Sequence, residues 1–432
     1  MPSVTTTPRS NNGLIKFTNG HVLRGLELIQ EDLWVSSRTG KIIASQAAFY
    51  DDKSLPDEIV DLGGRILAPG MIDCQLNGAF GFSFSTLLDD ANEYKKKVNE
   101  INQLLVATGV TSYLPTLTTQ RSELYREVLP YLGPSGRMRL ASNGSESLGA
   151  HCEGPFLNPN KNGIHNVDVM LEAHTFSDLE ECYGAKNLTP EHHEIETPIK
   201  MVTAAPERGN MSNLITELTQ RGIVYSIGHS EATYEDASQA VANGATMITH
   251  LFNAMRPLHH RNPGIFGVLG LAADAPKPFF GVIADGIHLH PTTTKIAYDA
   301  YPEGFILVTD AMHLTGLPDG SYPWVNGDQE TPSTVVKKGS KLLLGGSETI
   351  AGSAVTLLEC VNNFLEWTGQ SVPQALRAVT ATPAKMLHLE GVKGSLEQGA
   401  DADLIVLSEE DDGRRLRLDE VWKFGTMVAR HC

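Results

Sequence analysis

Several charged or titratable residues stand directly after short apolar runs, at positions that core packing does not explain. Four of them could form a hydrolytic metal site: Glu153 in GAHCEGPF, His229 in GIVYSIGHS, His250 in ATMITHLF and Asp310 in ILVTDA. Two imidazoles and one carboxylate are a usual ligand set for catalytic zinc, which keeps a fourth position open for water. Such an ion lowers the pKa of bound water towards 7 and polarises a carbonyl. These residue types indicate metal-dependent hydrolysis, with Glu153, His229 and His250 as ligands.

Each of these residues also has a purely structural interpretation. A single histidine of this kind is more often a half-buried structural residue than a ligand, and only the set of three donors favours metal binding. Asp310 could accept a proton from water and donate it to a leaving amine. It could equally cap the turn that follows its strand. The residues alone support these two roles of Asp310 to the same degree.

The segments that carry these residues alternate between two kinds of element. Eight short apolar runs lie between residues 65 and 311, and stretches with helical spacing that end in glycine separate several of them. This alternation is typical of parallel βαβ units. An open, doubly wound sheet is the alternative, but no GxGxxG follows the first strand, and eight units favour closure. We therefore predict an α/β fold built on a (β/α)₈ TIM-type barrel.

A closed barrel would bring these distant residues together, because the carboxyl ends of all its strands share one mouth. His229 and His250 flank a single predicted helix, so their strands should be neighbours about 4.8 Å apart. Asp73, Asp285 and His288 also stand near predicted strand ends. The predicted fold therefore supports one shared site.

The two ends of the chain differ from the middle. Residues 13–66 and 389–432 alternate apolar and polar residues around glycine turns, so we predict a small β-sandwich domain built from both termini. The predicted organisation is a disordered tail over 1–12, the first part of the β domain over 13–66, the barrel over 67–388 and the second part over 389–432. The irregular stretch from 158 to 198 is predicted to be a long loop with helical pieces that could cover the site.

The composition limits the possible partners and the compartment. The formal net charge is −17 over 432 residues, whereas nucleic acids and anionic membranes are bound through clustered Lys and Arg. The five cysteines show no CxxC spacing, which argues against a disulfide framework and a thiolate metal site. The N-terminal residues lack the apolar core of a signal peptide, and no apolar run is long enough to span a membrane. We expect a cytoplasmic protein that binds neither nucleic acid nor membrane.

Two loops carry further polar residues. The Gly-, Pro- and Asn-rich loop HCEGPFLNPNKNGIHN brings His165 near Glu153 as a candidate ligand-facing donor. The loop HLFNAMRPLHHRNPG contains Asn253 and a local basic cluster that includes Arg261, which is the best local site for an anion such as phosphate. A solvated loop face is the alternative for this cluster. The HHE segment at 192–194 lacks the HExxH order and is predicted to be surface.

These motifs together resemble the amidohydrolase superfamily, and within it the deacetylases that act on a 6-phosphorylated N-acetyl amino sugar. The resemblance covers nearly the whole chain, and its most specific parts are HCEGPF and THLFNAM. APGMIDCQLNG, IGHSEATYEDA, IADGIH, LVTDA and IAGSAVTLLE follow in the family's order, and the tail VTATPAKMLHLEGVKGSLEQGADADLIVL is similar to the superfamily's C-terminal signature. The resemblance implies the same barrel and a metal-dependent amide hydrolase.

The resemblance assigns roles residue by residue. It implies that Glu153, His229 and His250 hold the metal and that Asp310 is the catalytic carboxylate, which are the residues selected above. It implies that His288 acts in catalysis and contacts the sugar and carbonyl. The substrate contacts it implies are Ile164, His165, Asn253, Ala254, Arg261 for the phosphate, His288, Ile350, Ala351 and Gly352. It also implies a homodimer, because the family uses a partner arginine for the phosphate.

One departure concerns the metal. The superfamily's first strand usually carries His-x-His for a second ion, whereas this chain has Gln75 and Asn77. Amides are poor ligands beside imidazole. We therefore expect one divalent metal per subunit, with Zn²⁺ as the first choice and Co²⁺, Fe²⁺, Mn²⁺ or Ni²⁺ as alternatives.

The resulting expectation is hydrolysis of N-acetyl-D-glucosamine 6-phosphate to D-glucosamine 6-phosphate and acetate, in amino-sugar catabolism and recycling. Metal-activated water would attack the carbonyl, with Asp310 as general base and then general acid. A cyclic-amide hydrolase or a deaminase is the second interpretation, although these commonly use His-x-His and a carboxylated lysine. A non-catalytic scaffold with the same barrel is the third, although such relatives usually lose the ligands that this chain retains.

Overall fold

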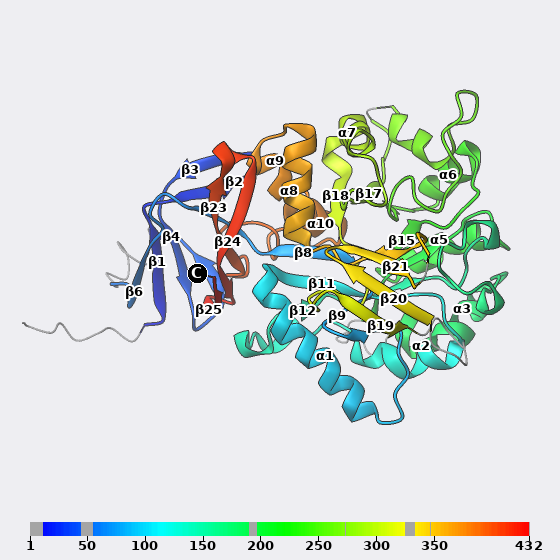
Figure 1. Cartoon of the computed structure of the whole chain (residues 1–432), viewed down its shortest axis with the longest axis horizontal. Helices are drawn as coiled ribbons and strands as arrows, with labels where there is room; N and C mark the ends of the chain where they lie inside the picture. The colour runs from blue at the N-terminus through cyan, green and yellow to red at the C-terminus, as the bar shows by residue number, and fades with distance from the viewer. Residues whose placement is uncertain are drawn as a thin grey trace, which may run out of the picture.

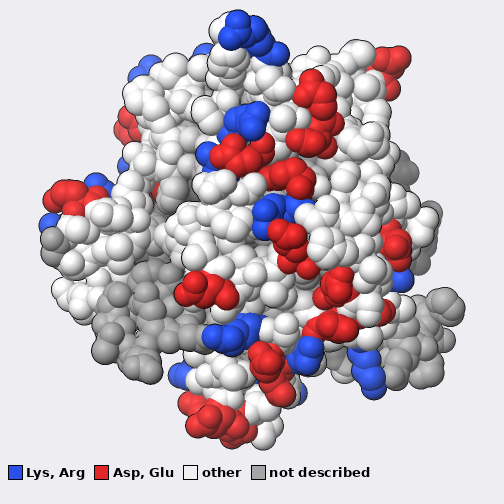
Figure 2. Space-filling view, turned by 90° about the vertical axis from the view of Figure 1, so that its right-hand side faces the viewer, with Lys and Arg blue, Asp and Glu red and all other residues white. Residues whose placement is uncertain are grey.

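The computed structural model describes residues 12–44, 55–189, 197–272, 274–324, 333–345 and 347–431. Nearly all of the predicted N-terminal tail and the HHE segment at 192–194 therefore lie outside the described residues. Within the described ranges, no helix is both long and apolar enough to cross a membrane. On the face turned away from the β domain, basic and acidic side chains are interspersed in small groups (Figure 2).

Eight parallel strands of the described chain form the barrel, as predicted (Figure 1). They are β8 (Met71–Leu76), β11 (Val110–Leu117), β13 (Ala150–Glu153), β14 (Ile199–Ala204), β15 (Val224–Ile227), β16 (Met247–Ile248), β17 (Phe279–Ile283) and β18 (Phe305–Val308). Each pairs with the next in this order, and the short β12 (Glu146–Ser147) extends the sheet beside β11. The barrel closes where Asp310 N donates to Gln75 O at 2.9 Å and Leu76 pairs with Ala311.

The strands are apolar because helices cover the outside of the barrel and side chains fill its inside. Every residue of β11 is buried, as expected for a parallel strand that is covered on both faces. The helices are α1 (Ala91–Leu105), α2 (Ser122–Val128), α3 (Phe176–Tyr183), α4 (Ala185–Leu188), α5 (Met211–Gln220), α6 (Tyr234–Ala242), α7 (Pro291–Ala300), α8 (Leu357–Thr368), α9 (Val372–Arg377) and α10 (Ala381–Met386). After β16, a 3₁₀ helix, η8 (Gly264–Gly270), stands in place of an α-helix.

The helix starts follow local capping chemistry. Thr233 and Asp236 form a capping box at the start of α6, and Thr356 and Glu359 form another at the start of α8. In each box the side chain of one residue accepts from the backbone of the other, which satisfies two donors that the first turn leaves free. These caps fix where each helix begins after its loop and so where the preceding strand end points.

The small β domain at one end of the molecule is built from both termini, as predicted (Figure 1). One sheet has the order β5-β4-β1-β6 and the other β25-β24-β23-β7-β2-β3. The strands are β1 (Leu14–Thr18), β2 (His21–Arg24), β3 (Glu27–Gln30), β4 (Leu33–Ser36), β5 (Lys41–Ile43), β6 (Glu58–Asp61), β7 (Ile66–Pro69), β23 (Leu404–Glu410), β24 (Arg415–Lys423) and β25 (Thr426–Arg430). Phe17 and Trp422 meet edge to face, 4.9 Å apart, in the core that the two sheets share.

A further sheet, beside the barrel and the two sheets of the β domain, was not predicted from the sequence. Four antiparallel strands between β18 and α8 form it: β19 (Gly320–Trp324), β20 (Ser333–Lys338), β21 (Lys341–Leu344) and β22 (Ile350–Ser353). Ser353 pairs with Ala311, directly after Asp310, so β22 is attached to the barrel mouth. A smaller hairpin, β9 (Gly78–Ala79) with β10 (Phe82–Ser83), follows β8. Both additions rise from loops at the mouth.

A buried ionic cluster joins the β domain to the barrel. We call Glu146, Lys393, Asp401, Asp403 and Lys423 the junction cluster; the exposure of each is below a tenth. Lys423 Nζ donates to Glu146 Oε1 at 2.6 Å and to Asp403 Oδ2 at 2.8 Å. Lys393 Nζ bonds Asp403 Oδ2 at 2.6 Å and pairs with Asp401 at 2.7 Å and with Glu146. Ammonium groups from the C-terminal segment thereby hold a carboxylate of the barrel.

Candidate metal centre and active-site cavity

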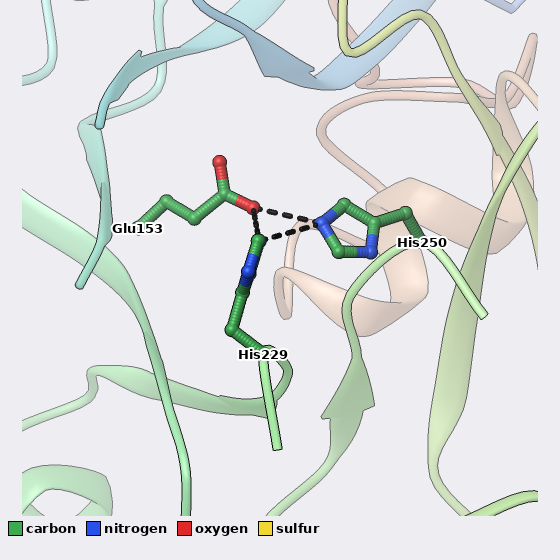
Figure 3. A group of neighbouring side chains, drawn as sticks. All are labelled: Glu153, His229 and His250. Carbon is green, nitrogen blue, oxygen red and sulfur yellow. Dashed lines mark hydrogen bonds and ion pairs between the residues drawn. The ribbon is translucent and has the colours of Figure 1, made fainter. Parts of the chain in front are cut away.

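Three donor atoms meet at the barrel mouth. Glu153 ends β13, and His229 and His250 each stand two residues beyond the ends of β15 and β16. Glu153 Oε1 lies 3.1 Å from His229 Nε2 and 2.9 Å from His250 Nε2, and the two Nε2 atoms are 3.1 Å apart (Figure 3). All three side chains are buried. The structure thus brings together the three predicted ligands.

The hydrogen-bond partners of these groups fit a bound cation. His229 Nδ1 lies 2.7 Å from the carbonyl oxygen of Lys161, so Nδ1 donates and the lone pair of Nε2 faces Glu153. Burial opposes ionisation of Glu153, but contacts with His229 and His250 outweigh it and hold its pKa well below the usual range. His250 Nδ1 is buried, and no atom of the described part of the chain forms a hydrogen bond with it. Three electron-pair donors that converge in a buried place are suited to a divalent metal.

Two amide side chains hold Asp310 beside this group. Asn77 Nδ2 donates to Asp310 Oδ1 at 2.7 Å, and Gln75 Nε2 donates to the same oxygen at 3.1 Å. Gln75 Nε2 also lies 3.0 Å from Glu153 Oε1. Burial and the charge of Glu153 raise the pKa of Asp310 to about 6. The amides that replace His-x-His therefore position the carboxylate.

In the structure, Asp310 does not cap the turn that follows its strand. Thr309 Oγ1 accepts from the backbone N–H of Ala311 at 3.2 Å and donates to Asp73 Oδ2 at 2.6 Å. Thr309 thus caps this turn, while the Asp310 carboxylate is engaged by Gln75 and Asn77. Burial raises the pKa of Asp73 to about 7. Asp73 lies one layer below the site and fixes the end of β18.

The backbone is strained where it presents these residues. His229, His250 and Asp310 have φ values of 49°, 27° and 46°, in the left-handed region that non-glycine residues rarely adopt. Each such conformation costs of the order of 1–3 kcal/mol, and such costs cluster at functional sites. Three of the four chemistry-bearing residues share this feature. The backbone conformation therefore identifies the same site independently of side-chain chemistry.

Two further histidines border the group. His288 Nδ1 lies 2.7 Å from Asp285 Oδ2; burial disfavours its charged form, but the carboxylate outweighs burial and raises the pKa of His288. His165 Nδ1 accepts from Thr119 N at 3.1 Å, which leaves its proton on Nε2, 3.8 Å from Glu153 Oε2. Burial lowers the pKa of His165 to about 3. His288 is therefore suited to act as a cationic donor and His165 as a neutral one.

A cavity of about 210 Å³ lies over these groups. Besides Glu153, His229, His250 and Asp310, the sequence-predicted residues that line it are Ile164, His165, Asn253, Ala254, His288, Ile350, Ala351 and Gly352. Arg261 is not part of this lining, and its side chain is exposed on the loop after β16. Asn253 Nδ2 is buried and has no hydrogen-bond partner among the described residues, so it is an available donor at this wall. The structure gathers all predicted substrate contacts except Arg261.

Some residues of the site were missed by the sequence analysis. Thr118, Gly163, Ile283 and Met312 also line the cavity, and the Lys161 carbonyl sets the tautomer of His229. Met312 stands two residues after Asp310, so its position beside a strand-end acid was a usable signal. The Lys161 contact joins residues 68 positions apart, and nothing in the local sequence indicates it.

Comparison with known proteins agrees with this geometry. The profile described as "Amidohydrolase family" matches residues 66–427. The chain belongs to this family, which confirms the resemblance found in the sequence. Within the family, the chain is similar to the N-acetylglucosamine-6-phosphate deacetylases: that of Mus musculus is 42% identical over 402 residues, which cover 92% of both chains.

Solved structures show the same relationship. The N-acetylglucosamine-6-phosphate deacetylase from Pasteurella multocida superposes with a TM-score of 0.78 at 26% identity, covering 97% of this chain and 100% of that one. A mutant of the enzyme from Mycobacterium smegmatis, in complex with N-acetyl-D-glucosamine-6-phosphate, superposes with a TM-score of 0.75 at 26% identity, covering 96% and 98%. The barrel with its attached β domain is thus a shared architecture.

Proposed function

We propose that this chain hydrolyses the acetamide of N-acetyl-D-glucosamine 6-phosphate to D-glucosamine 6-phosphate and acetate, in amino-sugar catabolism. The observation that carries the proposal is the convergence of Glu153, His229 and His250 next to a positioned carboxylate, Asp310. The relatives reported above bear the name of this activity. A cyclic-amide hydrolase with His-x-His is not favoured, since Gln75 and Asn77 are already engaged with Asp310.

Glu153, His229 and His250 would hold one divalent metal. Such an ion supplies Lewis acidity, which lowers the pKa of water and polarises the amide carbonyl. Zn²⁺ is our first choice for this donor set, and Co²⁺, Fe²⁺, Mn²⁺ or Ni²⁺ are alternatives. One ion per subunit is expected because the amides of Gln75 and Asn77 donate to carboxylates and do not offer a second ligand set.

Asp310 moves the proton in this proposal. Its Oδ1 accepts hydrogen bonds from Gln75 and Asn77, so Oδ2 remains for the reaction. The carboxylate accepts a proton from the attacking water and then donates it to the leaving amine of the substrate. Because the amides fix the plane of the carboxylate, the proton is delivered along one direction.

His288 stabilises the negative charge that develops on the carbonyl oxygen. Asp285 orients its ring and favours the protonated form, so a charged N–H donor lines the cavity. Donors that are fixed before the reaction stabilise an oxyanion without reorganisation. Asn253 and the backbone near Ala254 would hold the sugar phosphate, with Arg261 as the phosphate contact that the resemblance implies.

We also propose a homodimeric assembly and a cytoplasmic location. A homodimer would supply the partner arginine that the family resemblance implies, and the exposed position of Arg261 is compatible with a phosphate site at a subunit boundary. The test is mass measurement in solution.

A cytoplasmic location is supported by four described cysteines that are free and buried, which suits a reducing compartment.

The test of the function is acetate release by the metal-loaded protein, compared between N-acetylglucosamine and its 6-phosphate. We expect the phosphorylated sugar to be the better substrate and Asp310→Asn to lose about 10³-fold or more in kcat. An exposed carboxylate, Asp299→Asn, is the matched control. If the metal-loaded protein releases acetate no faster than the Asp310→Asn variant, the proposed mechanism is wrong.

A further inference from the structure

A second cavity of about 330 Å³ lies beside the active-site cavity. The two share five lining residues, which are Asn77, Thr118, Ile164, His165 and Met312. The rest of its wall comes from the segment 81–88 after β9, from Glu93 and Lys97 of α1, from Thr119 and Gln120, and from His313 and Pro323. We call this space the acyl chamber. Because of the shared wall, the two cavities form adjoining compartments at the barrel mouth.

The acyl chamber lies across the mouth from the wall that carries Asn253 and Ala254. In the closed order of eight strands, β11 and β16 are four positions apart, so they stand on opposite sides. Thr118 follows β11 directly, whereas Asn253 and Ala254 follow β16. The donor group at Glu153, His229 and His250 lies between these walls.

The geometry of the substrate then points its acyl group towards the chamber; this step rests on the proposed function. A secondary amide is planar and trans, so the carbon chain on the carbonyl points away from the sugar carbon on the nitrogen. With the sugar phosphate at Asn253 and the carbonyl at the donor group, the acyl chain points to the opposite wall. Thr118 stands on this wall and also lines the acyl chamber.

The walls of the chamber suit an uncharged chain. Ser85 Oγ accepts from the backbone N–H of Thr118 at 3.0 Å and from its hydroxyl at 3.1 Å, so these groups are already satisfied. Lys97 pairs with Glu100 at 3.1 Å, and Glu93 adds a negative charge to the same wall. Burial lowers the pKa of His313, which keeps it neutral. Among the described residues of this wall, the lysine, Lys97, is already paired with a carboxylate and is not free for an anionic guest.

We propose that the acyl chamber accepts N-acyl chains longer than acetyl, so that the enzyme also hydrolyses N-propionyl and N-butanoyl amino-sugar 6-phosphates. Water adds across the same C–N bond and releases the free amine and the corresponding carboxylic acid, without a further co-reactant. Phe82, Leu88 and Met312 supply apolar surface for the chain. Each methylene that leaves water for such a surface gains about fourfold in binding, so the longer chains retain high kcat/KM.

The experiment compares kcat/KM for N-acetyl-, N-propionyl- and N-butanoyl-glucosamine 6-phosphate in the zinc-loaded enzyme. We expect the butanoyl substrate to lie within about tenfold of the acetyl substrate. Thr86→Phe fills the chamber at a residue that does not line the active-site cavity, and the butanoyl-to-acetyl ratio should fall at least about tenfold. Thr292→Phe, at an exposed threonine of α7, is the matched control and should leave the ratio unchanged.

A second variant guards against misfolding of the first. Leu88→Ala enlarges the chamber, so the ratio for an N-hexanoyl substrate relative to acetyl should rise. The proposal is overturned if the wild type hydrolyses the butanoyl substrate below about a thousandth of the acetyl rate, or if neither variant changes the ratios. Failure of the proposed function gives a different result, because the acetyl substrate itself would then not be hydrolysed.

Discussion

Two buried groups of ionisable side chains stand at opposite ends of the barrel, and they differ in what neutralises them. At the mouth, Glu153, His229 and His250 present donor atoms within 3.1 Å of one another. At the other end, Glu146, Asp401 and Asp403 of the junction cluster also lie close enough to hold a metal. By the spacing of acidic and imidazole groups alone, the two would be taken for equivalent metal sites.

The difference lies in the lysines. In the junction cluster, Lys393 and Lys423 occupy the space between the carboxylates, so the positive charge is part of the chain. Burial opposes ionisation of Asp403, but Lys393 outweighs it and holds the pKa of Asp403 far below the usual range. No ammonium contacts Glu153 among the described residues, which leaves a cation to come from solution. Proximity of carboxylates therefore indicates a metal only when no internal cation fills the gap.

The largest effect is expected from Glu153→Gln, which removes one of the three proposed metal ligands at the barrel mouth. An amide is a poor ligand, and Gln75 and Asn77 on the first strand cannot replace the lost carboxylate. Bound metal should fall below about 0.2 per chain, and kcat/KM should fall about 10⁴-fold, or about 5 kcal/mol. Elemental analysis and acetate release measure both quantities. The exposed Glu127→Gln is the control, and full metal content in Glu153→Gln would contradict the ligand assignment.

The next effect is expected at the junction cluster, with Lys423→Met. This change leaves Glu146 and Asp403 buried with one ammonium fewer, and removal of one partner from a buried ionic group costs about 3–5 kcal/mol. We expect that loss in the free energy of unfolding, measured with urea, and an unchanged metal content. Lys96→Met, at a lysine whose side chain is 75% exposed, is the control. Equal stability of the two variants would show that the junction cluster does not hold the domains together.

A smaller effect is expected from Asn77→Ala. This variant loses a hydrogen bond that positions Asp310 but keeps all three proposed metal ligands. The hydrogen bond from Asn77 lowers the pKa of Asp310, so its loss raises that pKa above about 6. Asp310 must be ionised to accept a proton, so the acid limb of kcat/KM should move up by about one pH unit. The pH profile of the metal-loaded variant tests this, with the exposed Asn213→Ala as control. A purely structural role would lower kcat/KM at every pH and leave the limb in place.

The smallest effect is expected from Arg139→Met, at the rim of the junction cluster. Arg139 pairs with Asp401 but is 32% exposed, and Asp401 keeps Lys41 and Lys393, each at 2.7 Å. Partly exposed pairs contribute about 0–1 kcal/mol. Urea unfolding should therefore show a loss well below that of Lys423→Met. A loss as large as for Lys423→Met would mean that the rim, and not the buried lysines, stabilises the junction.

The barrel could be predicted because each of its strands is marked by a short apolar run in the local sequence. Runs such as GVTSYLPTL are apolar on both faces, and each of the eight runs contains or overlaps a barrel strand. The sheet of β19 to β22 was missed, although TVVKKGSKLLL alternates around a turn as a hairpin does. These strands lie inside the range 67–388 that was predicted to be barrel.

The site was predictable in its residue types and not in its geometry. Strand-end positions selected Glu153, His229, His250 and Asp310, and the structure brings them together. The left-handed backbone of His229 and Asp310 leaves no trace in composition, because neither position is a glycine. The acyl chamber depends on side chains from both ends of the barrel sequence, so only the folded chain reveals it. The phosphate contact at Arg261 stays a prediction.

The pairing of β7 with β23 has a consequence for how this protein is made. Ile66–Pro69 can find its antiparallel partner, Leu404–Leu407, only after the ribosome has delivered the entire barrel. During that interval the edge of β7 that faces β23 is open, and unpaired strand edges favour aggregation. We expect the nascent chain to depend on chaperones until the last strands emerge, and a nonsense codon late in the message to leave a complete barrel that is still insoluble.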